Sequence, residues 1–122
     1  MNDPKGRVVL VVDDDDMIRR LVRTVLEADE FEVAEATDGE SALALASTTE
    51  PAVVVLDIMM PGIDGVEVCR RLDHKRVKVI VLTARDDPEL EHDCREAGAN
   101  AFVTKPFSSI ELLDLVAELI AS

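Results

Sequence analysis

Acidic side chains directly follow two apolar runs of the chain, and this arrangement is the first indication of chemistry. Residues 51–56 read Pro-Ala-Val-Val-Val-Leu and lead into Asp57, while residues 7–12 lead into the four aspartates at 13–16. An apolar run that is rich in β-branched residues is typical of a strand buried on both faces. Its last side chain emerges at the carboxyl edge of a parallel sheet, where open α/β folds place their chemistry.

Carboxylates that converge at one sheet edge repel each other, and the arrangement is costly unless a cation lies among them. Mg²⁺ is the natural occupant, because it is a hard ion that prefers oxygen ligands. Asp13 and Asp14 can hold it directly or through water, and Asp57 can be both a ligand and a nucleophile. Asp15 and Asp16 are interpreted as the cap of the following helix and as solvated surface.

Two further apolar runs end in side chains of a complementary type. Thr83 follows the run 77–82, and Lys105 comes two residues after the run 101–103. A hydroxyl and an ammonium can each donate to a phosphoryl oxygen. Phosphoryl transfer needs little from a protein beyond positioning and charge neutralisation. The pattern therefore predicts a phosphoryl-transfer site in which Asp57 is the nucleophile.

Strand and helix patterns alternate five times, with a period of roughly twenty residues. The predicted strands are 7–12, 31–34, 51–56, 77–82 and 101–103. The helix signals are an apolar stripe from Met17 to Leu26, capping-box spacings at Thr37–Glu40 and Ser108–Glu111, Pro88 at a helix start and Gly98 at its end. This alternation predicts an α/β fold: one five-stranded parallel sheet, doubly wound, with helices on both faces. We expect a single domain over residues 1–122, with its core at about 6–120.

The last predicted helix carries more apolar positions than a helix needs to cover a sheet. Two stripes share it, one with Ile110, Leu113, Val116 and Ile120 and the other with Leu112, Leu115 and Leu119. Either the buried face is broad, or part of it is an exposed patch for a partner or a second copy.

Composition excludes several classes of function. The 122 residues include three Phe and no Trp or Tyr, so platforms for base stacking are missing, and the net charge of -13 argues against binding a phosphate backbone or an anionic membrane. Cys69 and Cys94 have no metal-ligand spacing and are expected to be buried free thiols. The chain has neither a secretory signal pattern nor a run of membrane-spanning length, which favours a cytoplasmic location. His74 and His92 are expected at the surface.

Five motifs in this order resemble the receiver domains of two-component response regulators, including the chemotaxis regulator, whose fold is flavodoxin-like. They are Val11–Asp14, Leu56–Gly65, Val81–Ala84, Gly98–Ala99 and Lys105–Phe107. The resemblance covers about residues 6 to 120. It implies a signalling switch, not an enzyme that turns over a small substrate.

Carried over by position, the resemblance implies that Asp57 accepts a phosphoryl group from a phosphohistidine of a sensor histidine kinase or a histidine phosphotransfer protein. Mg²⁺ would be held by Asp13, Asp14, Asp57 and the backbone carbonyl of Met59, and Lys105 and Thr83 would grip the phosphoryl oxygens. In the family, Thr83 moves on phosphorylation and the aromatic at Phe102 swings inward. That movement changes the face of the fourth helix, fifth strand and last helix, where an output domain, a target protein or a second copy would bind.

Two departures from the family pattern concern the switch and its lifetime. The switch aromatic is often Tyr, whereas Phe102 has no hydroxyl with which to bond a partner. Met59 and Arg85 occupy the positions that tune self-dephosphorylation in the family, and we expect them to set phosphoryl lifetime by gating water. The Lys105–Pro106 bond is expected to be cis, as in the family.

Two rival functions share the fold class. A phosphohydrolase of the haloacid-dehalogenase type would use Asp13 as its nucleophile in an Asp-x-Asp motif, but this leaves the Asp57 motif unexplained and provides no cap to select a substrate. A flavodoxin-like FMN carrier would need a glycine-rich phosphate loop, where this chain has four aspartates that repel phosphate. The sequence does not distinguish a stand-alone regulator from the receiver of a longer protein.

Overall fold

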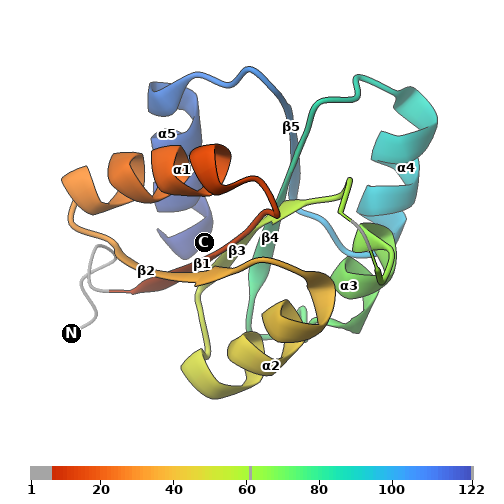
Figure 1. The fold of residues 1–122 in the computed structure, drawn as a ribbon, viewed down its shortest axis with the longest axis horizontal. Coiled ribbons are helices and arrows are strands. Elements are labelled where there is room, and N and C mark those ends of the chain that lie inside the picture. The colour runs from red at the N-terminus through yellow and green to blue at the C-terminus, as the bar shows by residue number, and fades with distance from the viewer. Residues whose placement is uncertain (1–6, 61, 122) are drawn as a thin grey trace.

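The predicted alternation is present in the computed structural model, which describes residues 7–60 and 62–121. Five parallel strands form one sheet in the order β2-β1-β3-β4-β5, as Figure 1 shows. The strands are β1 (Val8–Val12), β2 (Glu32–Ala36), β3 (Val53–Asp57), β4 (Lys78–Thr83) and β5 (Ala101–Thr104). The chain steps from β1 to β2 on one side and then returns to β3 on the other. The carboxyl ends of β1 and β3 therefore flank the point at which open α/β sheets bind their ligands.

Five helices cover the two faces of the sheet. They are α1 (Asp16–Ala28), α2 (Gly39–Thr49), α3 (Gly65–Arg71), α4 (Pro88–Glu96) and α5 (Ser109–Ala121). Two apolar cores result, one on each side, because alternate strand residues point to opposite faces. Helices α1 and α5 pack on one side through Val22, Leu26, Leu112 and Val116, and α2, α3 and α4 pack on the other through Ala42, Val68, Cys69 and Cys94.

Most helix signals act where they were predicted, with one shift by a residue. Asp15 caps α1, Pro88 begins α4, and the Ser108 hydroxyl accepts from the Glu111 amide, as expected. Helix α2 is capped by Asp38 and not by Thr37, since the Asp38 carboxylate accepts from the Ser41 amide at 2.8 Å.

The apolar stripes of α1 and α5 are only partly covered. Met17 is 81% exposed and Ile110 is 72% exposed, although both lie on predicted stripes. On α5, Leu112 and Val116 are buried and four other apolar side chains of the stripes are half-buried against the same core. The broad buried face is therefore the better description of α5, with Ile110 outside it.

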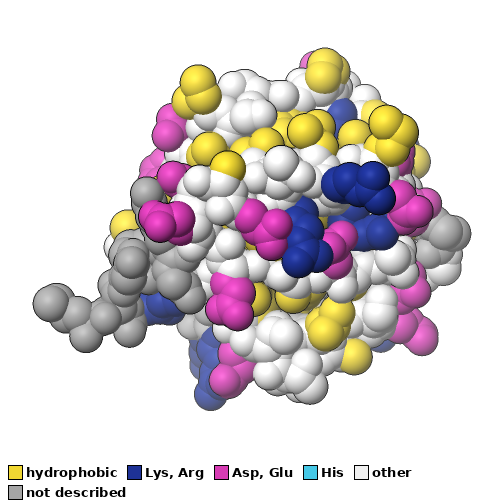
Figure 2. All heavy atoms as spheres, turned by 60° about the vertical axis from the view of Figure 1, so that its left-hand side comes forward, with side chains coloured by type: hydrophobic (Ala, Val, Ile, Leu, Met, Phe, Trp, Pro, Cys, Tyr) yellow, Lys and Arg dark blue, Asp and Glu magenta, His cyan; other side chains and the backbone are white. Residues whose placement is uncertain are grey.

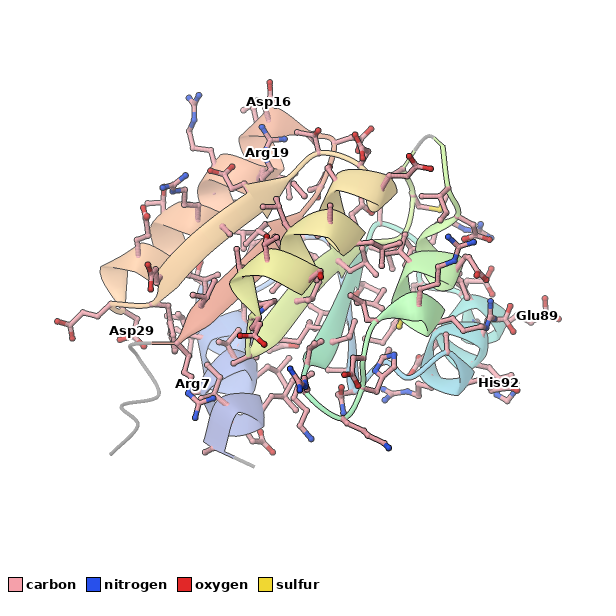
Figure 3. All side chains as sticks on the ribbon, turned by 90° about the horizontal axis from the view of Figure 1, so that it is seen from below. Arg7, Asp16, Arg19, Asp29, Glu89 and His92 are labelled. Atoms are coloured by element: carbon pink, nitrogen blue, oxygen red, sulfur yellow. The ribbon has the colours of Figure 1, made fainter. Side chains whose placement is uncertain are left out.

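His74 was expected at the surface, but it is half-buried. Its Nε2 donates to the Cys69 carbonyl at 2.6 Å, and its Nδ1 is buried without a hydrogen-bond partner among the described residues. A Cβ at Gly98, where φ is +114°, would lie 2.5 Å from this ring, so the glycine makes room for it. His92 is exposed on α4 as expected, and Figure 3 shows it pointing away from the body.

Cys69 and Cys94 are buried free thiols, as expected, and burial raises the pKa of each to about 11. Within residues 7–60 and 62–121, no helix has the length and apolar character needed to cross a membrane. Pro61, which belongs to the predicted loop motif after Asp57, lies outside these residues, as do residues 1–6 and 122 of the predicted domain.

Candidate functional site

Asp57 is the last residue of β3 and is only 5% exposed. The four residues before it are buried valines and a leucine, so the strand carries the carboxylate to the sheet edge from within the core. Its Oδ1 accepts from the Met59 amide at 3.0 Å, which fixes the carboxylate against the start of the following loop. The strand register pairs Asp57 with Leu82, one residue before Thr83.

Asp13 comes directly after β1 and is 2% exposed. Its amide donates to the Ala36 carbonyl of β2 at 3.2 Å, and its Oδ1 accepts from the Asp15 amide at 2.9 Å. The carboxylate is thus held in a tight turn at the β1–α1 junction, beside the end of β3.

Three carboxylates meet at this edge. One oxygen from each of Asp13, Asp14 and Asp57 lies within 4.8 Å of the other two, and of the three only Asp14 is exposed. Lys105, which follows β5, places its Nζ 3.0 Å from Asp13 Oδ2 and 3.8 Å from Asp57 Oδ2. The pocket therefore brings together four of the residues that the sequence assigned to it.

Burial is the main reason why the pKa of Asp57 is raised above its usual range. The hydrogen bond from the Met59 amide opposes the rise, the charge of Asp13 adds to it, and the charge of Lys105 opposes it. One ammonium among three carboxylates leaves the pocket with an excess of negative charge. This set of oxygen donors fits Mg²⁺, which prefers carboxylate ligands and would supply the missing positive charge.

Thr83 is fully buried at the end of β4. Its carbonyl accepts from the Lys105 amide at 2.7 Å, so the ends of β4 and β5 adjoin beside the pocket. Its hydroxyl accepts from the Arg85 amide at 3.2 Å, and the Arg85 side chain pairs with Asp87 at 2.7 Å. The Met59 side chain is 50% exposed.

Phe102 is half-buried on β5, opposite Val81 of β4, and packs against the core beneath α2, α3 and α4. The Lys105–Pro106 bond is cis, as predicted.

Comparison of the sequence with protein families identifies the family of this chain. The family model of the response regulator receiver domain matches residues 9–117. The chain belongs to the response regulator receiver domain family. It is a domain of two-component signalling, of the class that acts as a phosphorylation-dependent switch, and the haloacid-dehalogenase-type alternative has no support from this match.

Individual relatives agree with this family membership. The chain is 40% identical over 106 residues to the transcriptional regulatory protein SrrA of Staphylococcus aureus, covering 86% of this chain and 44% of SrrA. It therefore spans less than half the length of the curated relatives that it matches. The receiver domain of Francisella response regulator 1452 is 35% identical, with a TM-score of 0.87 and coverage of 95% and 98% of the two chains. A CheY-like receiver protein from Methanospirillum hungatei JF-1 is 27% identical, with a TM-score of 0.90 and coverage of 95% and 94%.

One residue beside the pocket of this receiver domain was missed from the sequence. Arg19 of α1 donates from Nη1 to the Asp13 carbonyl at 2.9 Å, from Nε to Glu35 at 2.9 Å and from Nη2 to Asp16 at 2.6 Å. A signal was present in the sequence. Glu35 is a charged residue directly after the predicted strand 31–34, and Arg19 and Arg23 lie one helical turn apart.

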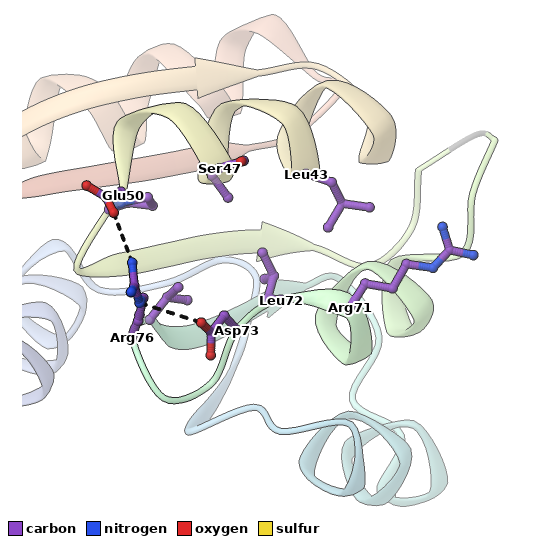
Figure 4. Close-up of a pocket in the computed structure, with 10 residues that line it drawn as sticks. Leu43, Ser47, Glu50, Arg71, Leu72, Asp73 and Arg76 are labelled. Atoms are coloured by element: carbon purple, nitrogen blue, oxygen red, sulfur yellow. Dashed lines mark hydrogen bonds and ion pairs between the residues drawn. The ribbon is translucent and has the colours of Figure 1, made fainter.

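A separate hollow of ≈ 280 Å³ lies at the opposite edge of the sheet (Figure 4). It lies between the ends of α2 and α3, near the residues that precede β3 and β4. Arg76 crosses its rim and pairs with Glu50 at 3.0 Å and with Asp73 at 3.7 Å. Because parallel strands present their chemistry at the carboxyl edge, this hollow is remote from the acidic pocket.

Proposed function

We propose that Asp57 is the phosphoacceptor of this receiver domain and that phosphorylation there changes the face formed by α4, β5 and α5. The observation that carries the proposal is the placement of the Asp57 carboxylate. It is buried at the end of β3, within 4.8 Å of two other carboxylates and 3.8 Å from the Lys105 ammonium. A nucleophile, a divalent-cation site and a fixed cation are the parts that phosphoryl transfer needs.

In the proposed reaction, a carboxylate oxygen of Asp57 attacks the phosphorus of a phosphohistidine on a sensor histidine kinase or a phosphotransfer protein. An O–P bond forms and the N–P bond breaks, and the departing imidazole keeps the electron pair and takes up a proton from solvent. The product is an acyl phosphate on Asp57. Attack of water on the same phosphorus later returns free Asp57 and inorganic phosphate.

The chain's own groups stabilise the transferring phosphoryl group. Lys105 supplies a point charge, and Thr83 supplies a hydroxyl when it leaves its bond with the Arg85 amide. Asp13, Asp14, Asp57 and the Met59 carbonyl would hold Mg²⁺, which neutralises charge that develops on the phosphoryl oxygens. The domain acts on itself and releases only phosphate, so its output is a change of conformation.

The proposed response begins at Thr83 and ends at Phe102. Both residues lie on the adjoining strands β4 and β5, and Phe102 is half-buried and therefore has room to change its exposure. A change there alters the α4-β5-α5 face, which we propose contacts an output domain, a target protein or a second copy of the chain. SrrA is a transcriptional regulatory protein, so an output that controls transcription is one candidate.

Two residues beside the pocket are proposed to set the lifetime of the phosphoryl group. Met59 and Arg85 flank the pocket at half-exposed and exposed positions, from which their side chains can control the access of water to the acyl phosphate.

Residues 1–122 would form one receiver domain. The two free thiols agree with a reducing cytoplasm as its location.

The test is incubation with acetyl phosphate and Mg²⁺, followed by intact-mass measurement and peptide mapping. Wild type, Asp57→Asn and Asp13→Asn are run together. We expect a hydroxylamine-labile phosphoryl group on Asp57 in wild type that is lost without Mg²⁺ and absent from Asp57→Asn. A phosphoryl group on Asp13, or an unmodified wild-type protein under all conditions, would refute the assignment.

A further inference from the structure

The guanidinium of Arg19 donates hydrogen bonds to three separate parts of the chain. It bonds the carbonyl of Asp13 after β1, the carboxylate of Glu35 in β2 and that of Asp16 in the first turn of α1. The Arg19 side chain is only 14% exposed, so these bonds are partly shielded from water. Figure 3 shows Arg19 and Asp16 together at one end of α1, next to the carboxyl edge of the sheet.

Glu35 holds the guanidinium in place from the other side. Its second oxygen accepts from Arg23, one helical turn beyond Arg19. Partial burial tends to raise the pKa of Glu35, but the hydrogen bonds from Arg23 and Arg19 lower it overall. Glu35 is therefore ionised at neutral pH and pairs with both cations. On the face that carries α1 and β2, basic and acidic side chains lie next to one another (Figure 2).

The Asp13 backbone depends on its hydrogen bond with Arg19, because Asp13 lies outside regular secondary structure. Its amide bonds Ala36 of β2 at 3.2 Å, and its carbonyl bonds Arg19 at 2.9 Å. The peptide units on both sides of the Asp13 Cα are therefore held, which restrains the Asp13 backbone and keeps the carboxylate in reach of the Asp15 amide and Lys105. A lost carbonyl bond would release one of these two ties.

We propose that Arg19 is a positioning residue for the acidic pocket, holding the Asp13 backbone so that its carboxylate faces Asp57. Glu35 keeps the guanidinium aligned for this bond. The consequence for Mg²⁺ affinity rests on the proposed function, whereas the consequence for the Asp13–Asp15 turn does not. Groups that orient ligands in this way change metal affinity by about 10–100-fold when they are removed.

Charge and positioning predict opposite results when Arg19 is replaced. Removal of a cation near three carboxylates makes the pocket more negative, so Coulomb attraction alone would tighten Mg²⁺ binding. Loss of the anchor lets the Asp13 carboxylate move, which weakens binding. The sign of the change in Mg²⁺ affinity therefore separates the two effects.

Arg23 provides a matched control on the same helix. It carries the same charge and also bonds Glu35, but its other bond is to Glu27 and it does not contact Asp13. Arg19→Lys provides a second comparison, because it keeps the charge while its compact ammonium cannot bond three separated acceptors at once.

The experiment is a calorimetric Mg²⁺ titration of the full chain for wild type, Arg19→Ala, Arg19→Lys and Arg23→Ala. We expect both Arg19 variants to raise the Kd for Mg²⁺ about tenfold and Arg23→Ala to change it less than twofold. Unchanged or tighter binding in both Arg19 variants, or an equal loss in Arg23→Ala, would overturn the proposal.

A second readout needs no metal. Amide hydrogen exchange of Asp15 reports its bond to the Asp13 carboxylate, and we expect faster exchange in the Arg19 variants but not in Arg23→Ala. If wild type fails to bind Mg²⁺, the metal site of the proposed function is wrong, and the Asp15 exchange alone decides whether Arg19 positions the turn. If Arg19→Ala does not fold, the Mg²⁺ affinity and the Asp15 exchange of Arg19→Lys decide between the two effects.

Discussion

Replacement of Asp57 by Asn should stabilise the metal-free protein while it abolishes the proposed switch. Asp57 is 5% exposed, and one of its carboxylate oxygens lies within 4.8 Å of oxygens of Asp13 and Asp14. An asparagine has nearly the same shape, keeps an oxygen for the Met59 amide and carries no charge. The substitution therefore removes a repelled charge with little change in packing.

The size of the effect follows from the charges that surround Asp57. At an effective dielectric constant of about 20, repulsion from Asp13 is about 3.5 kcal/mol at the 4.8 Å limit, and attraction to Lys105 at 3.8 Å is about 4 kcal/mol. These two nearly cancel. What remains is desolvation of the carboxylate and repulsion from exposed Asp14, offset in part by the Met59 bond. We expect a net stabilisation of about 1–2 kcal/mol, which is about 4–8 °C in Tm for a domain of this size.

The gain should depend on pH in a defined direction. Burial is the largest cause of the raised pKa of Asp57, so the folded protein holds a proton on this carboxyl group more tightly than the unfolded chain does. The ionised carboxylate therefore costs stability at neutral pH, and the cost fades as the pH falls through the folded pKa toward the ordinary value of about 4. The advantage of Asp57→Asn over wild type should shrink over the same window.

The assay is urea unfolding followed by circular dichroism, in buffer with chelator and again with Mg²⁺. Asp114→Asn, at an exposed position on α5, makes the same change in net charge and serves as the control. Mg²⁺ at ten times its Kd should stabilise wild type by about 1.4 kcal/mol and Asp57→Asn much less. The reasoning is refuted if Asp57→Asn is less stable than wild type without metal, or if Asp114→Asn gains as much stability.

Other parts of the fold lead to three further predictions. Glu35→Gln should lose less free energy of unfolding than wild type does as the pH is lowered into the acid range. Burial favours a higher pKa for Glu35, but its hydrogen bonds with the arginines lower the pKa overall. The stability that the ionised Glu35 contributes in wild type is therefore present above about pH 4 and is lost as the pH falls through the folded pKa. If urea unfolding shows the same fall in stability with acid in both proteins, this prediction is contradicted. Leu112→Ala should cost about 2–5 kcal/mol and Ile110→Ala less than about 0.5, measured by thermal unfolding, because their exposures are 0% and 72%. Glu30→Gly should stabilise by about 0.5–1 kcal/mol, since φ is +68° there, while Glu30→Ala should not, and a Gly variant no more stable than the Ala variant would count against backbone strain at this position.

The helix boundaries illustrate how far local signals carry. Asp15, Pro88 and Ser108 act at helix starts as predicted, because a cap or a proline needs only the residues next to it. The shift from Thr37 to Asp38 at α2 shows the limit. Both side chains suit the role, and the exit of β2 at Ala36 decides which one meets the helix amides.

The α/β class, the five strands and the acidic ends of β1 and β3 could be predicted from the residues alone, because β-branched runs and their terminal residues are local features. The sequence also predicted that Asp13, Asp14, Asp57 and Lys105 share a pocket, since parallel strands end at one edge. The hydrogen bond from Arg19 to the Asp13 carbonyl and the place of His74 beside Gly98 could not be predicted in this way. Those contacts depend on the angle and depth at which a helix or loop packs on the sheet. The packing of all side chains in the two cores sets this angle and depth, and the spacing of residues along the chain does not encode it.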